Sequence, residues 1–422
     1  MAAATTSDGA LTTADGIPLK ASLARAERRN RNRALLLVTP LFAFILVFFL
    51  MPIFDMLTRS VDNTVVGSVL VRSVPVLSQW DDSSGELPSE AVFKAMVLDI
   101  QDGRETRTIG KVGTRMNYEK SGMTSLFRKS GRRAKQIKEA PYKEALIKLD
   151  KKWGDINTWR LLKRESDAQT LTHYLASIDM RFNDSGEVVR QPEEKQIYIN
   201  LFIRTLKLSA LITVLCLVLG YPISYLLATL PVRTSNLLMI LVLLPFWTSL
   251  LVRTTAWIAL LQKQGVINDF LVGVGLIGDD GRLAMIHNAI GTVVAMVHIL
   301  LPFMVLPLYS VMKTIPPSYV RAARSMGATP WTAFWRVYVP NTVSGIGAGG
   351  ILVFIIAIGY YITPALVGGV SGTLISNFIA QHISVTLNWG LAAALGSVLL
   401  ALVLALYILY DKIVGIDNMK MG

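Results

Sequence analysis

The chain is poor in the residues that carry catalysis and covalent cross-links. Its 422 residues include one cysteine, Cys216, and four scattered histidines. A single cysteine excludes a disulfide framework within the chain, and we expect Cys216, inside an apolar run, to be a small core residue. No histidine lies at ligand spacing from Cys216 or from a second histidine. We therefore expect no metal site, and no enzyme built on a nucleophile and its base.

A phosphate-binding loop is also missing. No segment matches the Gly-rich pattern GxxxxGK[ST] that cradles nucleotide phosphates. We therefore expect that the chain does not hydrolyse ATP itself. The net charge of +13 does not indicate nucleic acid, because much of it flanks apolar segments. Basic residues in that position are typical of membrane topology and of contact with anionic lipids.

Apolar sequence is what the chain has in excess. Hydrophobic residues make up 52% of it, and its mean hydropathy of +0.47 is too high for an ordinary soluble domain. A helix needs roughly 20 apolar residues to cross a hydrocarbon core of about 30 Å. The sequence predicts an all-α membrane protein with six transmembrane helices, in the runs Ala34–Phe54, Tyr198–Leu227, Leu237–Leu261, Met285–Tyr309, Val343–Leu366 and Trp389–Tyr410.

These runs divide the chain into parts of different character. We expect a basic N-terminal tail (1–33), a first transmembrane helix (34–57), a polar insertion (58–197), a five-helix core (198–411) that contains a cytoplasmic loop (314–342), and a C-terminal tail (412–422).

Lysines and arginines near the span ends predict the orientation. Five arginines precede the first run: Arg25, Arg28, Arg29, Arg31 and Arg33. By the positive-inside rule that end is cytoplasmic, and six spans return the C-terminus to the same side. The basic residues that then fall on the cytoplasmic side are Arg233, Lys313, Arg321, Arg324, Arg336, Lys412 and Lys420. The insertion would then face the periplasm of a two-membrane bacterium. A cleaved signal peptide is the competing interpretation of the first run, although no clear small-residue cleavage site follows it.

The insertion is expected to be mostly helical. It opens with strand-like alternation between Val65 and Val76. Apolar residues then recur at three- and four-residue spacing in Ala91–Ile100, Tyr142–Lys152 and Ala168–Ile178. A basic stretch, Arg128–Lys138, is interpreted as the solvated face of a helix. Whether the insertion docks a partner or only supports the bundle is left open.

A polar segment between the fourth and fifth runs has the features of a partner-binding loop. We expect Ser318 to cap a short helix, Gly327 to end it with a positive φ, and Thr329 with Pro330 to begin a second helix. Four aromatic residues predict a stripe that anchors this second helix on the bundle: Trp331, Phe334, Trp335 and Tyr338. Pro340 is expected to end it. The alternative is an interfacial connector without a partner.

The same residues resemble the "EAA" loop of ABC-importer permeases, the cytoplasmic element that grips an ATPase subunit. The family pattern is Glu-Ala-Ala, three residues, Gly, nine residues, Ile, any residue, Leu-Pro. Ala322, Ala323, Gly327 and Pro340 match it, whereas Arg321 stands where Glu is typical. The resemblance implies an ATPase-coupling loop that contains Arg321, Ala322, Ala323, Arg324, Gly327, Ala328 and Pro340.

Other segments are similar to permeases of the spermidine/putrescine type: Leu244–Ser249 with Arg253, Gly265–Asn268, Leu301–Tyr309 and Thr363–Gly369. They lie within about half of the chain, Tyr198–Tyr410. The resemblance implies the type I ABC-importer permease fold in the inner membrane, with ATP and Mg²⁺ on a separate ATPase dimer. It also implies a second homologous permease and a periplasmic binding protein that delivers the solute. The long insertion departs from these relatives, in which this connection is usually much shorter.

Six residues are candidates for the solute path: Trp247, Arg253, Trp257, Tyr360, Tyr361 and Thr363. For Arg253 the alternative is snorkelling to the outer headgroups, and for the aromatic residues it is an interfacial belt or core packing. No Asp or Glu lies in the last five apolar runs, and Tyr360 stands where relatives often carry Glu. A polyamine is therefore a less certain cargo than a weaker cation, an amino-acid derivative or an opine-like conjugate.

Two other classes of membrane protein are alternatives to a permease. An ion-coupled secondary transporter typically has internal repeats and titratable groups at mid-membrane, and the sequence has neither pattern. A non-transporting scaffold is the third possibility. A GxxxG pattern at Gly345 and Gly349 suits either an interface with another permease or packing within the chain.

Overall fold

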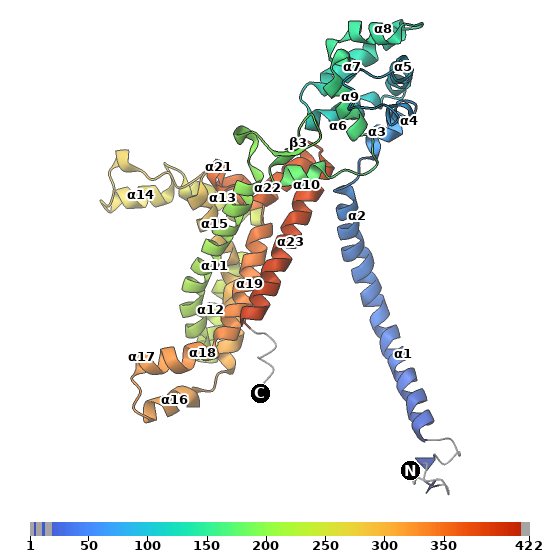
Figure 1. Cartoon of the computed structure of the whole chain (residues 1–422). Helices are drawn as coiled ribbons and strands as arrows, with labels where there is room; N and C mark the ends of the chain where they lie inside the picture. Colours follow the sequence, from blue (N-terminus) through green and yellow to red (C-terminus); the bar gives the residue numbers. More distant parts are fainter. Residues whose placement is uncertain (1–3, 6–10, 13–18, 415–422) are drawn as a thin grey trace. The chain divides into compact units, whose positions relative to one another are not determined.

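The computed structural model describes residues 4–5, 11–12 and 19–414, and the chain forms two units, 1–59 and 60–422 (Figure 1). Most of the C-terminal tail, including Lys420, lies outside the described residues. The first unit contains strands β1 (Ala4–Thr5) and β2 (Leu11–Thr12), helix α1 (Leu19–Ile45), a π segment (Leu46–Leu50) and helix α2 (Met51–Arg59).

The helix of the first unit is longer than its apolar run. It begins at Leu19, because the Ala, Leu, Arg and Glu residues before Ala34 favour helix. Between Glu27 and Arg59 it is long and apolar enough to cross a membrane, and none of its most apolar stretch is buried. A fully exposed apolar helix of this kind is compatible with a span that faces lipid or another protein.

In the described residues, four helices can span a membrane, or up to six if each of two bent helix pairs is one span. The unbroken spans in the second unit are α11 (Tyr198–Thr229), α15 (Ala289–Thr314) and α23 (Trp389–Val414). In the first bent pair, α12 (Val232–Leu243) forms one arm, and α13 (Leu250–Leu261) and α14 (Val266–Gly273) form the other, with a bend of 96° between the arms. In the second pair, α17 (Pro330–Ala333) and α18 (Val339–Asn341) form one arm and α19 (Val343–Gly359) the other, with a bend of 59°.

Two of the predicted spans are therefore not single helices. The run Leu237–Leu261 breaks where a 3-10 turn (Leu244–Trp247) contains Pro245 and where Ser249 caps α13. The run Val343–Leu366 breaks after Gly359, and a separate helix α20 (Ile362–Val367) follows. The remaining core helices are α16 (Pro317–Ser325), α21 (Gly369–Gly372) and α22 (Ile375–Ser384).

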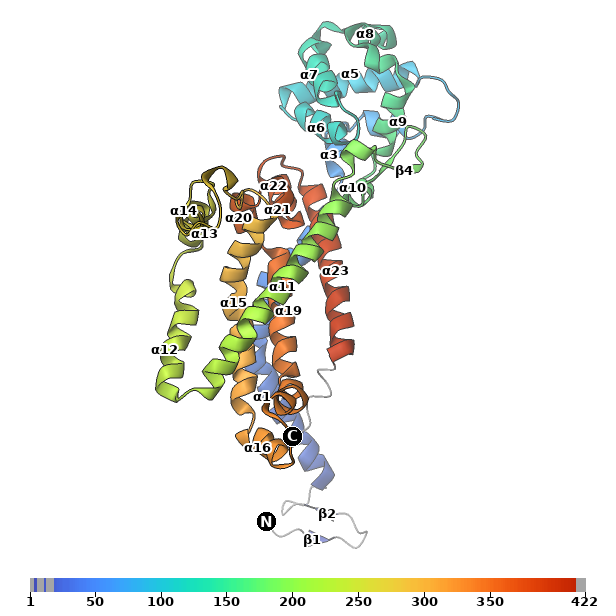
Figure 2. The same cartoon turned by 90° about the vertical axis from the view of Figure 1, so that its left-hand side faces the viewer.

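Helices α11, α15 and α19 pack together as the centre of the bundle (Figure 2). Cys216 is buried there, and its Sγ lies 3.7 Å from the carbonyl oxygen of Val297, as expected for a core residue. A Cβ added at Gly349 would lie 2.8 Å from Sδ of Met304 on α15. The GxxxG pattern therefore brings α19 close to α15 within this chain.

The insertion is helical throughout its first part. Its helices are α3 (Thr64–Val69), α4 (Ser73–Leu77), α5 (Glu90–Glu105), α6 (Ile109–Glu119), α7 (Met123–Arg133), α8 (Tyr142–Leu149), α9 (Ile156–Arg164) and α10 (Thr172–Ser177). A hairpin of β3 (Met180–Phe182) and β4 (Val188–Arg190) follows.

The strand-like pattern at Val65–Val76 was misleading, because this segment forms α3 and α4. Its buried residues Val66, Leu70 and Leu77 recur at helical intervals, and Val69, Val74 and Val76 are partly buried beside them. The three predicted helical segments are confirmed: α5 extends beyond Ala91–Ile100, and α8 and α10 are shorter than the segments in which they lie. Most basic side chains of Arg128–Lys138 are exposed, which confirms the solvated face.

The insertion has its own aromatic core. Trp153 and Trp159 are fully buried, with ring centroids 5.3 Å apart. Phe93 and Phe127 extend the cluster, with centroids 4.6 Å from Trp159 and 5.5 Å from Trp153 respectively. Both indole nitrogens are satisfied, since Trp153 donates to Ser130 Oγ and Trp159 to the carbonyl oxygen of Trp153. A separate core of this size indicates that the insertion folds around its own side chains.

A buried ion pair joins the two ends of the insertion. Arg115 Nη2 lies 2.6 Å from Glu165 Oε2, and Arg115 Nε donates to Asn63 Oδ1 over 2.7 Å. The backbone nitrogen of Asn63 also donates to the carbonyl oxygen of Ala168, at 2.9 Å. The chain therefore leaves the helical part of the insertion close to where it entered.

Asp179 connects the insertion to the first helix of the core. Its carboxylate accepts hydrogen bonds from the backbone nitrogens of Ile197, Tyr198 and Ile199, at 3.1, 3.0 and 2.8 Å. These N–H groups belong to the start of α11, where a helix has unpaired donors and a positive dipole end. A buried carboxylate from the hairpin thus caps a membrane-spanning helix.

The buried histidine of α10 predicts a loss of stability in acid. Burial, with a smaller effect of Arg115, lowers the pKa of His173 from 6.5 to about 4, while Asp62 opposes the shift. The folded state thus disfavours the imidazolium, so its stability is complete above pH 6.5 and falls as the pH drops toward 4. This one group accounts for about 3 kcal/mol over that window.

Thermal unfolding of the detergent-solubilised chain between pH 7 and pH 4.5 measures this effect. We expect His173→Gln to show a flatter pH dependence than the parent. His287→Asn changes an exposed histidine and should leave the pH dependence of thermal unfolding unchanged. Equal slopes for the parent and His173→Gln would contradict the assignment.

Candidate functional site

The predicted coupling loop is a helical hairpin with a well-defined turn. Gly327 has φ of 90°, and its N–H donates to the carbonyl oxygen of Arg324 at 3.0 Å. The N–H of Ala328 donates to the carbonyl oxygen of Ala323 at 3.1 Å. These two bonds form a Schellman motif, which ends α16 and needs a left-handed residue at the position of Gly327. The predicted positive φ is confirmed.

The caps of the hairpin match the prediction only in part. Thr329 accepts a hydrogen bond from the N–H of Thr332 and begins α17, with Pro330 in the first turn, as expected. The prediction for Ser318 is wrong, because α16 is capped at Pro316 and Ser318 lies inside the helix. Consecutive prolines fix the entry of the chain, and Pro317 is favoured in a first turn.

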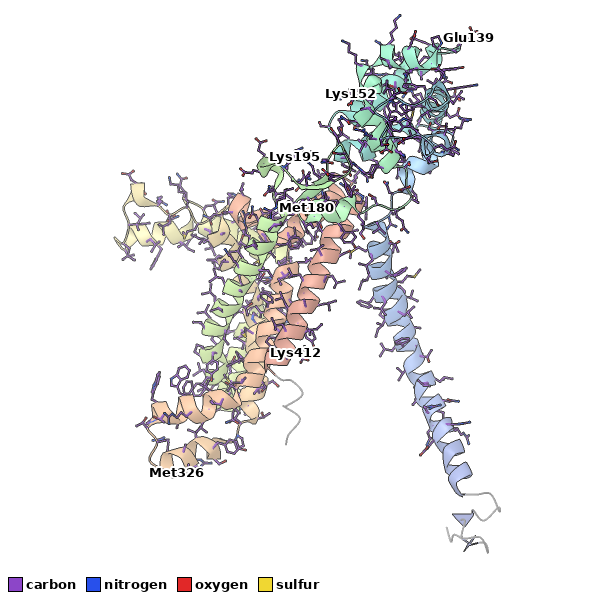
Figure 3. All side chains as sticks on the ribbon, viewed as in Figure 1. Glu139, Lys152, Met180, Lys195, Met326 and Lys412 are labelled. Carbon is purple, nitrogen blue, oxygen red and sulfur yellow. The ribbon has the colours of Figure 1, made fainter. Side chains whose placement is uncertain are left out.

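One face of α16 points outward and the other inward. Ala323 is buried and Val320 is half-buried, whereas Arg321, Ala322 and Arg324 are exposed. Met326, at the turn that Figure 3 labels, is 83% exposed. The segment 313–342 contains four basic residues and no acidic one. The exposed surface of the loop therefore combines small, basic and apolar side chains.

An aromatic cluster attaches the hairpin to α11. The Phe334 ring lies 6.2 Å from Tyr221 and 5.7 Å from Tyr225, and the Tyr338 ring lies 5.2 Å from Tyr225. The Tyr221 hydroxyl also hydrogen-bonds Thr342 at 3.1 Å. The sequence does not indicate this role for Tyr221 and Tyr225, because nothing in their apolar run distinguishes them from other aromatic residues of the spans. We name Tyr221, Tyr225, Phe334 and Tyr338 the aromatic anchor.

Only half of the predicted aromatic stripe takes part in this anchor. Trp331 and Trp335 are 71% and 51% exposed and pack on each other, with centroids 5.6 Å apart. A π turn at Phe334–Tyr338 has more residues per turn than an α-helix and changes the direction of the following side chains. The prediction for Pro340 is also wrong, because Pro340 lies inside α18 and the chain bends only after it.

The structure brings four of the six candidate path residues together. Arg253 and Trp257 lie on α13, and Tyr360 and Thr363 lie at the break between α19 and α20. Thr254 Oγ1 and Thr363 Oγ1 are 3.3 Å apart and buried, which ties α13 to α20. Trp257 follows Arg253 by four residues, so the two side chains lie on the same face of α13.

His298 is the member of this cluster that the sequence did not indicate. Trp257 Nε1 donates to His298 Nδ1 over 3.1 Å, and the two rings are 5.4 Å apart. An isolated histidine in an apolar run carries no signal for such a role. The other two candidates, Trp247 and Tyr361, are 73% and 47% exposed.

The five-helix part of the chain matches a known family of membrane proteins. The model of the family described as "Binding-protein-dependent transport system inner membrane component" matches residues 198–414. The first helix and the whole insertion lie outside this match.

Curated relatives match the same half of the chain. The spermidine/putrescine transport system permease protein PotB of Haemophilus influenzae is 33% identical over 222 residues, which are 52% of this chain and 77% of PotB. PotB of Escherichia coli is 36% identical over 213 residues, 50% of this chain and 76% of the relative. The inner membrane ABC transporter permease protein YdcU of Escherichia coli is 31% identical over 226 residues, which are 51% of this chain and 72% of YdcU.

A solved structure shows a weaker likeness. It is a bacterial ABC transporter involved in the import of the acidic polysaccharide alginate. The TM-score is 0.41 at 19% identity, over 55% of this chain and 82% of that chain.

Proposed function

Since this chain belongs to the family of binding-protein-dependent transport system inner membrane components, we propose that it is the permease subunit of an ATP-driven importer. It would accept a small solute from a periplasmic binding protein and pass it to the cytoplasm. The observation that supports this most strongly is the exposed α16–α17 hairpin, whose turn at Gly327 and attachment to α11 suit a coupling element.

The partners follow from this role. A dimer of ATPase subunits would bind the hairpin at Arg321, Ala322, Ala323, Arg324, Gly327, Ala328 and Pro340. ATP and Mg²⁺ would be bound by these ATPase subunits and not by this chain. A second homologous permease would complete the path. The chain would lie in a bacterial inner membrane with both termini cytoplasmic, which places the basic loops inside.

The solute is proposed to be a polyamine or a related amino compound, including opine-like conjugates. Two relatives that support this are spermidine/putrescine permeases, at 33% and 36% identity. Trp257 and Tyr360 offer aromatic faces to an ammonium group, an interaction that strengthens when water is excluded.

The hairpin would transmit motion as a rigid body. ATP closes the ATPase dimer, the hairpin moves with it, and the aromatic anchor carries the movement to α11. The bundle then changes from inward-facing to outward-facing, and the solute enters from the binding protein. Packed aromatic rings resist deformation, so displacement at α16 is passed on instead of being absorbed.

Purification of the chain from its native membrane in mild detergent tests the proposal. We expect an ATPase and a second permease in stoichiometric amounts, identified by mass spectrometry. Uptake should require ATP and should persist when an ionophore collapses the ion gradient. Recovery of the chain alone in several detergents, or uptake that follows the gradient, would favour the secondary transporter.

Substitution of Gly327 tests the hairpin itself. Gly327→Val should keep membrane insertion but weaken ATPase retention about 5- to 30-fold, because a β-branched residue at positive φ costs roughly 1–2 kcal/mol or more. No atom lies within 4 Å of an added Cβ, so the effect comes from the backbone and not from a clash. Gly327→Asn is the matched control, since Asn tolerates this conformation. Normal retention by Gly327→Val would count against docking at this turn.

A further inference from the structure

Arg253 has an unusual environment for a charged residue in an apolar segment. Within the described residues, its Nε and Nη1 atoms are shielded from solvent and have no hydrogen-bond partner. None of the ion pairs found among these residues involves it. A guanidinium with unpaired donors is costly at membrane depth, so the site is incomplete without an acceptor.

The groups around Arg253 are also donors. His298 Nδ1 accepts the hydrogen bond from Trp257 Nε1, so a neutral imidazole carries its proton on Nε2. The Nε2–H and the guanidinium can therefore both donate to an acceptor. The apolar runs from Tyr198 onward contain no Asp or Glu that could supply one.

Two helix breaks meet at this cluster. Arg253 lies in the first turns of α13, after the break that contains Pro245, and Tyr360 lies in the break between α19 and α20. In membrane transporters, interrupted helices are tolerated where they are buried in protein or line a solute path. The aromatic rings of Trp257 and Tyr360 also suit the apolar walls of a small-molecule site.

We propose that Arg253 and His298 bind an anionic group, most simply a carboxylate, of the transported solute. The solute then carries both an amine and a carboxylate, and a bare polyamine fits this site poorly. The inference rests on the proposed function and specifies its solute class. Arg253 provides the fork that binds a carboxylate through two hydrogen bonds, and the Nε2–H of His298 provides a further donor.

A matched pair of solutes tests this. Putrescine and 4-aminobutyrate have chains of similar length, but one end is an amine in the first and a carboxylate in the second. Each is supplied with the binding protein to the assembled transporter in proteoliposomes, and ATP-driven uptake is measured. We expect uptake of 4-aminobutyrate to exceed that of putrescine.

Three variants assign the effect to Arg253. Arg253→Gln should lower uptake of 4-aminobutyrate about tenfold or more while the subunits and ATP hydrolysis are retained. Arg253→Lys keeps the positive charge but loses the planar pair of N–H donors, and this variant should retain part of the uptake. Arg233→Gln makes the same change at an exposed position of α12 and should have no effect.

Several results would overturn the inference. Uptake of putrescine alone, uptake of neither solute by a complex that hydrolyses ATP, or equal uptake of 4-aminobutyrate by parent and Arg253→Gln would each do so. Loss of the second permease from purified Arg253→Gln would show that Arg253 pairs with a neighbouring subunit instead. None of these four results would contradict the proposal that the chain belongs to an importer. Absence of an ATPase from the purified parent would contradict that proposal itself.

Discussion

Replacing Arg115 with methionine is expected to destabilise the insertion by about 3–5 kcal/mol, because it leaves a buried carboxylate without its main partner. The Glu165 side chain is fully buried, and after the change its carboxylate would keep only weaker contacts, with Arg164 Nε at 3.1 Å and with the Asn63 amide nitrogen at 3.5 Å. Asn63 would lose the donor from Arg115 Nε at the same time. The ends of the insertion would then be held by backbone hydrogen bonds and by the Asn63 amide, which donates to the carbonyl oxygens of Glu165 and Asp167 at 2.9 and 3.1 Å.

Urea unfolding of the solubilised chain, followed by the fluorescence of its tryptophans, measures this change. Lys135→Met is the control, because Lys135 and Glu105 form an exposed pair with side chains 65% and 64% accessible. An exposed pair is worth less than about 1 kcal/mol. The double variant Arg115→Met with Glu165→Leu should recover much of the loss, since it removes both charges. Similar unfolding midpoints for Arg115→Met and Lys135→Met would refute the expectation.

Replacing Phe334 with alanine is expected to separate ATP hydrolysis from uptake. The ring of Phe334 contacts Tyr221, Tyr225 and Tyr338, so its removal leaves a gap between the hairpin and α11. The turn at Gly327 is unchanged by this substitution, and the ATPase should still bind. Movement of the hairpin would then be absorbed by the gap, and we expect uptake per ATP hydrolysed to fall at least about tenfold.

The ratio of uptake to ATP hydrolysis in proteoliposomes is the quantity to measure. Phe378→Ala is the matched control, because Phe378 packs on Tyr198, with ring centroids 6.4 Å apart, and not on the hairpin. Phe334→Leu, which keeps most of the apolar volume, should have an intermediate ratio. An unchanged ratio in Phe334→Ala would remove the aromatic anchor from the coupling route.

The prediction succeeded where a local rule determines the conformation. The turn at Gly327 and the cap at Thr329 depend on only a few neighbouring residues, and both are present. The failures come from longer-range effects. The valines of Val65–Val76 suit either a strand or a helix, and burial against the insertion core selected the helix. Spanning helices tolerate proline, so Pro245 by itself did not distinguish a broken helix from an unbroken one in the run Leu237–Leu261.

By itself, the sequence determined the membrane character of the chain, its helical class, its family and the position of the hairpin between Lys313 and Thr342. Each of these depends on composition, on short motifs or on spacing along the chain. Only the tertiary structure decided which side chains meet. It placed Tyr221 and Tyr225 against the hairpin, His298 against Trp257, and Asp179 at the start of α11. Such contacts join residues far apart in sequence, so they follow from packing and not from any local pattern.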